Sequence, residues 1–269
     1  MSEHLPVRKT YKLYIGGQFP RSESGRSYPV TAPDGTVVRV AEGSRKDVRD
    51  AVRAARSAQP GWAAKTAYNR GQVLYRVAEV LEGRRSQFPA GEVQDAIDRW
   101  VWYAGWTDKI QQVSGSLNPV AGPYWNVTAP EAVGVVGLAA PEAPSLLGLV
   151  SRLAPALVGG NTVVVLASEA SPLPAVDLAE VLATSDVPGG VVNIITGHKA
   201  ELLPWLAGHF DVDSIDVTGV PDELLADVER EAAANVKRVV RPEQGPLDQS
   251  PHDVLRFMEH KTVWHPVGS

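Results

Sequence analysis

The side chains that could carry chemistry in this chain are few, and none of them is a cysteine. The absence of cysteine excludes a thiol nucleophile, a disulfide and a thiolate metal site. Of the six histidines, His260 and His265 stand closest together, but they are expected to be surface residues, and no metal site is predicted. Ser145 and Ser168 could act as nucleophiles only beside a base, and no histidine position indicates pairing with either. The residue types therefore predict no catalytic residue, and a serine enzyme of altered chemistry ranks last among the functions considered.

The overall charge argues against polyanionic partners. The 269 residues carry a formal net charge of −5 and an isoelectric point near 5.7, so binding to nucleic acid or to an anionic membrane surface is not expected. The first ten residues are polar and do not resemble a signal peptide. No apolar run reaches the roughly 20 residues that span a bilayer. We therefore expect a cytoplasmic protein without nucleic-acid or membrane partners.

A strand, a helix and a second strand are predicted near the middle of the chain. Residues 133–138 form an apolar, β-branched run without charge, typical of a strand buried on both faces. Residues 146–157 carry apolar side chains at helical spacing, and two glycines then end the helix. Residues 162–166 form a second buried strand. This order predicts a βαβ unit, whose crossover is almost always right-handed.

The alternation continues downstream. Three more strands are predicted at 191–195, 214–217 and 235–240, with helices at 172–184, 199–207 and 221–234. Five strands alternating with helices predict an α/β fold with a Rossmann-like, doubly wound parallel sheet.

The segments before this core predict strands and then helices. A hairpin is expected at 11–19 and a turn with a strand at 30–40, followed by helices at 44–61, 68–84 and 91–112. The last helix carries an aromatic cluster that we expect to pack into the core: Trp100, Trp102, Tyr103 and Trp106.

The amino-acid sequence of the core segments resembles that of the aldehyde dehydrogenase superfamily. The similarity lies in Leu-Ala-Pro-Ala-Leu at 153–157, Gly-Asn-Thr-Val-Val at 160–164, and Val-Pro-Gly-Gly-Val-Val-Asn-Ile-Ile-Thr-Gly at 187–197. Residues 134–138 are similar to the first strand of the family's cofactor domain. No single segment is diagnostic, but their order and spacing together are specific.

The resemblance implies a division of the chain into four parts. Residues 1–113 are the N-terminal strands and helices of a cofactor-type domain, and 114–132 are a small β bridging segment. Residues 133–241 are the Rossmann-like core, and 242–269 are a linker and a C-terminal oligomerisation arm. The family's catalytic domain lies between the fifth strand and the arm, where this chain has only a short loop. The resemblance therefore implies a truncated member.

This sequence also lacks the residues with which the family oxidises aldehydes. Members use a cysteine nucleophile, and the oxyanion is held by the asparagine of a Pro-Trp-Asn motif, which reads Pro141, Glu142 and Ala143 in this sequence. The resemblance therefore implies a subunit without catalytic residues.

The cofactor motifs are altered as well. The family's Lys-Pro-Ser-Glu reads Leu-Ala-Ser-Glu at 166–169, and its Phe-Thr-Gly-Ser reads Val-Thr-Gly-Val at 217–220. The candidate cofactor residues are therefore Ser168, Glu169, Thr218 and Gly219, expected to be vestigial. Glu142 is expected to repel a pyrophosphate group. This pattern predicts no cofactor, or at most weak NAD binding.

The C-terminal arm is the candidate interface. Lys261, Thr262, Val263 and Trp264 are similar to the family's arm, a strand that docks on a neighbouring subunit. An isolated strand exposes unpaired N–H and C=O groups. The favoured hypothesis is a non-catalytic subunit that assembles with an intact NAD(P)-dependent aldehyde dehydrogenase and supports or regulates it. The alternatives are a stand-alone nucleotide-binding or sensing module, and an arm that folds back on its own domain.

Overall fold

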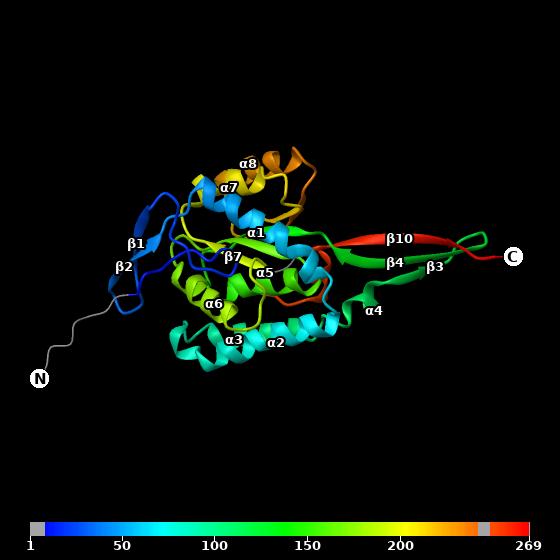
Figure 1. Ribbon diagram of the computed structural model, residues 1–269, viewed down its shortest axis with the longest axis horizontal. Coiled ribbons are helices and arrows are strands. Elements are labelled where there is room, and N and C mark those ends of the chain that lie inside the picture. The colour runs from blue at the N-terminus through cyan, green and yellow to red at the C-terminus, as the bar shows by residue number, and fades with distance from the viewer. Residues whose placement is uncertain (1–8, 242–247, 269) are drawn as a thin grey trace, which may run out of the picture.

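The computed structural model describes residues 9–241 and 248–268, and a five-stranded parallel sheet lies at its centre. The strands run in the spatial order β7-β6-β5-β8-β9 (Figure 1). This topology confirms the predicted doubly wound α/β fold. The strands are β5 (Val135–Ala139), β6 (Thr162–Leu166), β7 (Val192–Ile195), β8 (Ser214–Asp216) and β9 (Arg238–Val240).

Helices cover both faces of the sheet, because alternate side chains of each strand point to opposite faces. Val136 and Leu138 of β5 belong to the core under one helical layer, and Val135 and Ala139 belong to the core under the other. Figure 1 shows the two layers on either side of the sheet. The first layer contains α5 (Leu147–Val158) and α6 (Leu173–Ala183), and the second contains α1 (Arg45–Ala63), α7 (Lys199–Ala207) and α8 (Asp222–Ala233).

A further pair of helices, α2 (Ala67–Gly83) and α3 (Val93–Ala104), packs against α5 and α6 from outside. Trp100 and Tyr103 are fully buried, and Trp102 and Trp106 are partly buried against the same core, so the aromatic cluster packs into the core as expected. The helix expected at 91–112 is divided: after α3 the chain makes turns and then forms the short α4 (Ile110–Ser114). A short 3₁₀ helix, Arg85–Gln87, follows α2.

The N-terminal segments lie at the end of the sheet where its strands finish. β1 (Ser27–Thr31) and β2 (Val37–Ala41) form an antiparallel hairpin. The hairpin predicted at 11–19 is reduced to a tight turn in which Ile15 bridges Gln18. Next to this turn, Tyr14 bridges Ile194, so the segment extends the outer edge of β7 instead of forming its own sheet.

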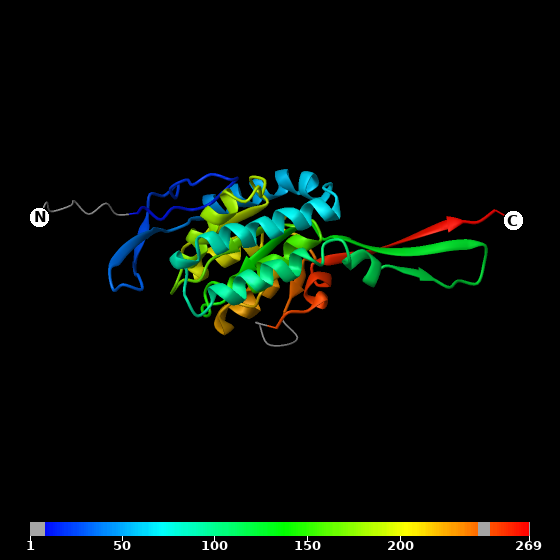
Figure 2. The ribbon, with the colours of Figure 1, turned by 90° about the horizontal axis from the view of Figure 1, so that it is seen from below.

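A three-stranded sheet projects from the opposite end of the molecule (Figures 1 and 2). Its strands are β3 (Ser116–Asn118), β4 (Tyr124–Ala132) and β10 (Met258–Pro266), in the spatial order β10-β4-β3. β10 pairs with β4 along its whole length, from Met258 opposite Ala132 to Pro266 opposite Tyr124. The arm therefore folds on its own chain along one edge. This pairing is the alternative in which the arm folds back on its own chain, and it satisfies one edge of the strand because β4 matches it residue for residue.

The segment before β10 anchors the arm to the domain. α9 (Pro251–Leu255) carries Val254, which is buried with Phe257 in the main core. The loop predicted at 241–252 lies partly outside the described residues, since 242–247 are not described. Among the helices that the structure does describe, none has the length and apolar character needed to cross a membrane.

Candidate functional site

The strand order defines where a ligand site is expected. β5 is followed by β6 and β7 on one side, whereas β8 and β9 lie on its other side. In open α/β sheets, ligands bind at the carboxyl ends of the strands beside such a switch point. Here the switch point lies between the ends of β5 and β8. Gly219 is needed there, because its N–H donates to the Ala139 carbonyl at 3.0 Å and an added Cβ would lie 2.1 Å from the Ala140 oxygen.

A buried lysine occupies this switch point. Lys199 is the first residue of α7, and its side chain is only 1% exposed. Its Nζ donates to the carbonyl of Ala140 at 2.7 Å and to that of Gly219 at 2.8 Å, so it joins the ends of β5 and β8. It also forms an ion pair with Glu142. The structure therefore places a fixed positive charge where this fold binds its ligands.

Sequence reasoning did not single out Lys199. The available signal was its position: it follows the third predicted strand closely, and residues just after parallel strands gather at the ligand-binding edge of the sheet. No local motif predicts that its side chain crosses to residues 140 and 219, which are 59 and 20 positions away in the chain.

Glu142, in the loop between β5 and α5, is held by donors from neighbouring loops. Its Oε2 accepts hydrogen bonds from the Ser168 hydroxyl at 2.8 Å and from the Ala170 N–H at 3.0 Å, and Lys199 pairs with Oε1. Burial acts to raise the pKa of the Glu142 carboxyl, but the donors from Ala170, Lys199 and Ser168 outweigh it and hold that pKa below its ordinary value. The negative charge of the carboxylate is therefore balanced by Lys199 within the chain, whereas the sequence alone suggested an unpaired charge that would repel a pyrophosphate group.

Glu169 lies on the same edge and binds the start of α7. Its carboxylate accepts the backbone N–H of Lys199 at 2.8 Å and pairs with Nδ1 of His198 at 2.7 Å. The tyrosine ring of the β1 hairpin, Tyr28, packs over His198 with the ring centroids 5.4 Å apart. Thus Glu142 in the loop after β5 and Glu169 in the loop after β6 both contact Lys199, which lies shortly after the end of β7.

The four candidate cofactor residues lie along this edge to different degrees. Ser168 and Glu169 share the cluster with Glu142 and Lys199, and Gly219 joins it through its carbonyl. Thr218 lies next to Gly219, and its N–H donates to Asp216 at 2.9 Å. Within the described part of the chain, the buried hydroxyl of Thr218 has no hydrogen-bond partner. The edge therefore offers a cation, an acceptor carboxylate and an unused hydroxyl.

The site offers binding groups without a nucleophile. The Ser168 hydroxyl donates to Glu142 and accepts the Ser171 N–H at 2.9 Å, so its hydrogen bonds hold the loop. The one histidine of the cluster, His198, faces Glu169 and not a serine. Across residues 9–241 and 248–268, no group of three or more histidine, cysteine, aspartate or glutamate side chains could hold a metal.

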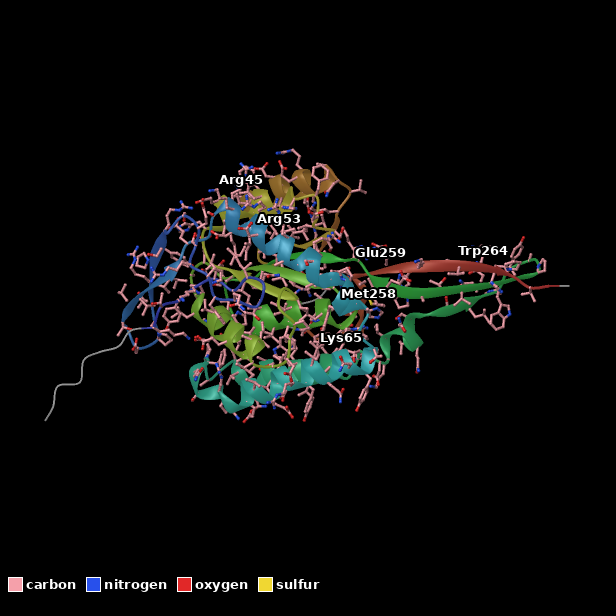
Figure 3. All side chains as sticks on the ribbon, viewed as in Figure 1. Arg45, Arg53, Lys65, Met258, Glu259 and Trp264 are labelled. Atoms are coloured by element: carbon pink, nitrogen blue, oxygen red, sulfur yellow. The ribbon has the colours of Figure 1, made fainter. Side chains whose placement is uncertain are left out.

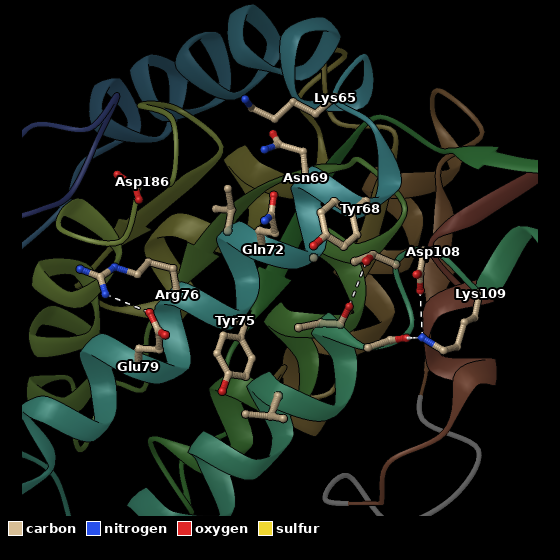
Figure 4. A pocket seen from close by; sticks show the side chains of 16 residues that line it. Lys65, Tyr68, Asn69, Gln72, Tyr75, Arg76, Glu79, Asp108, Lys109 and Asp186 are labelled. Carbon is tan, nitrogen blue, oxygen red and sulfur yellow. Dashed lines mark hydrogen bonds and ion pairs between the residues drawn. The ribbon is translucent and has the colours of Figure 1, made fainter.

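A surface pocket lies elsewhere, between the end of α1 and the outer helices α2 and α3 (Figure 4). It has a volume of about 840 Å³. It shares no residue with the switch-point cluster, which comprises Glu142, Ser168, Glu169, His198, Lys199 and Gly219. Four of the charged residues that line it form two ion pairs, Arg76 with Glu79 and Lys109 with Asp108, both at 2.9 Å. This surface hollow therefore lacks the convergent, buried polar groups found at the switch point.

Comparisons with known proteins agree with the fold. The profile of the aldehyde dehydrogenase family matches residues 19–245. Human aldehyde dehydrogenase 1A1 is 31% identical over 280 residues, covering 94% of this chain and 55% of the relative. The cytosolic 1 aldehyde dehydrogenase of Elephantulus edwardii is 34% identical over 248 residues, covering 85% of this chain and 49% of the relative. The chain belongs to the aldehyde dehydrogenase family and spans about half the length of the curated relatives it matches.

Solved structures extend the comparison to bound ligands. The NAD⁺ complex of an aldehyde dehydrogenase from Bacillus cereus superposes with a TM-score of 0.80 at 28% identity, over 87% of this chain and 50% of that chain. PnpE in complex with nicotinamide adenine dinucleotide gives a TM-score of 0.81 at 29% identity, with the same coverage.

These complexes correct the expectation that the chain binds no cofactor, or NAD only weakly. That expectation counted the groups lost at aligned positions, chiefly the lysine replaced by Leu166 and the charge added by Glu142. It was wrong because it missed Lys199, which brings a positive charge to the same edge from a different strand and neutralises Glu142.

Proposed function

We propose that this chain is a nucleotide-binding, non-catalytic subunit of the aldehyde dehydrogenase family that assembles with an intact member of the family. The observation that carries the proposal is the switch-point cluster, in which Lys199 joins the ends of β5 and β8 and Glu169 lies beside it. NAD-bound relatives with the same fold support NAD(P) as the ligand.

The residues present fit a dinucleotide by their chemistry. Lys199 would hold a phosphate group, and Glu169 would accept a hydrogen bond from a ribose hydroxyl. The Thr218 hydroxyl, which has no hydrogen-bond partner among the described residues, would donate to a phosphate oxygen. The nicotinamide group, when bound, supplies a hydride acceptor. The role of this chain is to bind and orient that cofactor.

Aldehyde oxidation is assigned to the partner because this chain lacks the groups for it. Its 269 residues contain no cysteine, so no thiol can attack an aldehyde carbon. Ala143 stands where the family places its oxyanion asparagine, and it has no side-chain donor. Loss of one such donor typically costs about 2.7–4 kcal/mol of transition-state stabilisation.

The projecting arm supports the assembly part of the proposal. β10 is an edge strand, since β4 pairs with only one of its sides in the described sheet. The arm carries exposed apolar side chains far from the body of the domain, including Trp264 (Figure 3). Exposed strand edges and large aromatics are typical of strand addition to a partner sheet. The partner proposed here is an intact aldehyde dehydrogenase, joined through Lys261, Thr262, Val263 and Trp264.

Native mass spectrometry of the untagged chain, purified with an intact relative from its own cells, tests this function. The expected result is a hetero-oligomer that retains a dinucleotide on this chain, together with no NADH production by the isolated chain across an aldehyde panel. A folded chain that turns over an aldehyde alone, or that never associates with a family member, would contradict the proposal. A truncation lacking residues 259–269 is the matched control for the arm.

A further inference from the structure

The switch-point cluster contains an anion cradle already filled by the protein. Three donors converge on the Glu142 carboxylate: the Lys199 ammonium, the Ser168 hydroxyl and the Ala170 N–H. Ser168 and Ala170 lie in the loop after β6, Lys199 is the first residue of α7, and the carboxylate comes from the loop after β5. Such a convergence of a cation, a hydroxyl and a backbone N–H is a general means of binding a carboxylate or phosphate.

The cradle and its occupant differ in how firmly they are held. The Lys199 side chain is 1% exposed, and its Nζ is fixed by two backbone carbonyls that do not depend on Glu142. The Glu142 side chain is 44% exposed, and among the described residues its carboxylate is held only by the three donors of the cradle. Rotation of Glu142 toward solvent would therefore empty the cradle without displacing its donors.

An emptied cradle cannot remain so at low cost. Lys199 would stay buried without a counter-charge, and a buried charge that loses its partner is strongly unfavourable. A second anion must therefore take the place of Glu142. An uncharged ligand offers no such replacement, whereas a phosphate group offers both the charge and acceptor oxygens for Ser168 and Ala170.

We propose that the Glu142 carboxylate is a tethered competitor for the phosphate group of an incoming ligand. The inference rests on the proposed nucleotide-binding function and deepens it. When Glu142 fills the cradle, the apparent affinity for a phosphate-bearing ligand falls by the fraction of time that the cradle is free. The chain thereby selects ligands by their charge and binds them more weakly than its donors alone would allow.

The test compares wild type with Glu142→Ala and Glu142→Gln by isothermal titration calorimetry. The probes are inorganic pyrophosphate, NAD⁺ and adenosine. If Glu142 occupies the cradle at least nine-tenths of the time, its removal raises the affinity for pyrophosphate and NAD⁺ at least tenfold. Adenosine, which has no phosphate, shows no change. The added Lys199→Met substitution removes the gain.

Glu79→Ala is the matched control, because Glu79 is 47% exposed and also pairs with one cation, Arg76. It leaves all three affinities unchanged. Glu142→Gln keeps the size of the side chain and so separates loss of charge from loss of packing. Circular dichroism on each variant verifies that it is folded.

Failure of this inference and failure of the proposed function give different results. If wild type binds NAD⁺ and neither Glu142 variant binds NAD⁺ or pyrophosphate more tightly, the competitor role is overturned while nucleotide binding stands. If the Glu142 variants bind pyrophosphate more tightly but no variant binds NAD⁺, the cradle is established and the dinucleotide assignment fails. A gain that persists with Lys199→Met would also overturn the inference, since the cation is its essential donor.

Discussion

Asp216 offers a quantitative test of how the core supports the candidate site. Its carboxylate lies at the end of β8, is fully buried, and pairs with the guanidinium of Arg152 through contacts of 2.7 and 2.8 Å. Its second oxygen accepts the N–H of Thr218 at 2.9 Å, at the turn that leads to the switch point. The perturbation is Asp216→Asn, which keeps the shape and an acceptor for Thr218 but removes the charge.

The magnitude follows from burial. The Arg152 side chain is 2% exposed, so removal of its main counter-charge leaves a nearly uncompensated buried cation, which typically costs about 3–5 kcal/mol. Asp253 remains 3.4 Å from the guanidinium, which favours the lower end of that range. The expected loss in the free energy of unfolding is therefore about 3 kcal/mol.

Urea denaturation followed by far-UV circular dichroism measures this loss. With an m-value of about 2–3 kcal/mol per molar urea, the midpoint falls by about 1 M or more. Arg152→Met combined with Asp216→Asn removes both charges and recovers part of the stability. Asp227→Asn is the exposed control: its ion pair with Arg230 lies on the surface, so its loss changes stability by less than about 1 kcal/mol. A change of less than 1 kcal/mol for Asp216→Asn would refute the reasoning.

Three further predictions concern the site and the arm. The pKa of Glu142 is lower in the folded chain than its ordinary value of 4.5. Its carboxylate therefore stabilises the fold above pH 4.5, and this stabilisation is lost as the pH falls through the lowered pKa. Glu142→Gln should flatten this acid-side loss of stability in melting curves recorded at different pH values. Gly219→Ala should distort the switch point, because the added Cβ would lie 2.1 Å from the Ala140 oxygen; calorimetry should show at least tenfold weaker NAD⁺ binding, and unchanged binding would contradict the packing argument. Trp264→Ser should weaken assembly in native mass spectra while leaving NAD⁺ affinity unchanged, since the arm and the switch point lie at opposite ends of the sheet (Figure 1).

The core of the fold was predictable because its signals are local. Each residue of β5 and β6 is buried, and the uncharged apolar runs at 133–138 and 162–166 record that burial directly. The helix between them, α5, carries its own apolar spacing and ends at Gly159. The parallel order of the sheet then follows from the alternation of strands and helices.

The site was only partly predictable, because its decisive contacts are long-range. Ser168 and Glu169 could be placed from a contiguous motif, but the pairing of Lys199 with Glu142 joins residues 57 positions apart. The pairing of β10 with β4 joins segments more than 100 residues apart, and the sequence pattern of an edge strand does not specify which chain provides its partner. Periodicity reports which face of an element is buried, and it carries no information on which distant side chain meets it.

The most direct test of the central claim is a calorimetric titration of NAD⁺ into wild type and into Lys199→Met. We expect saturable one-site binding to wild type and a loss of at least tenfold in affinity for the variant, because Lys199 is the buried cation at the switch point. A folded wild-type chain that gives no binding heat at millimolar NAD⁺, or a folded variant that binds as tightly as wild type, would contradict it.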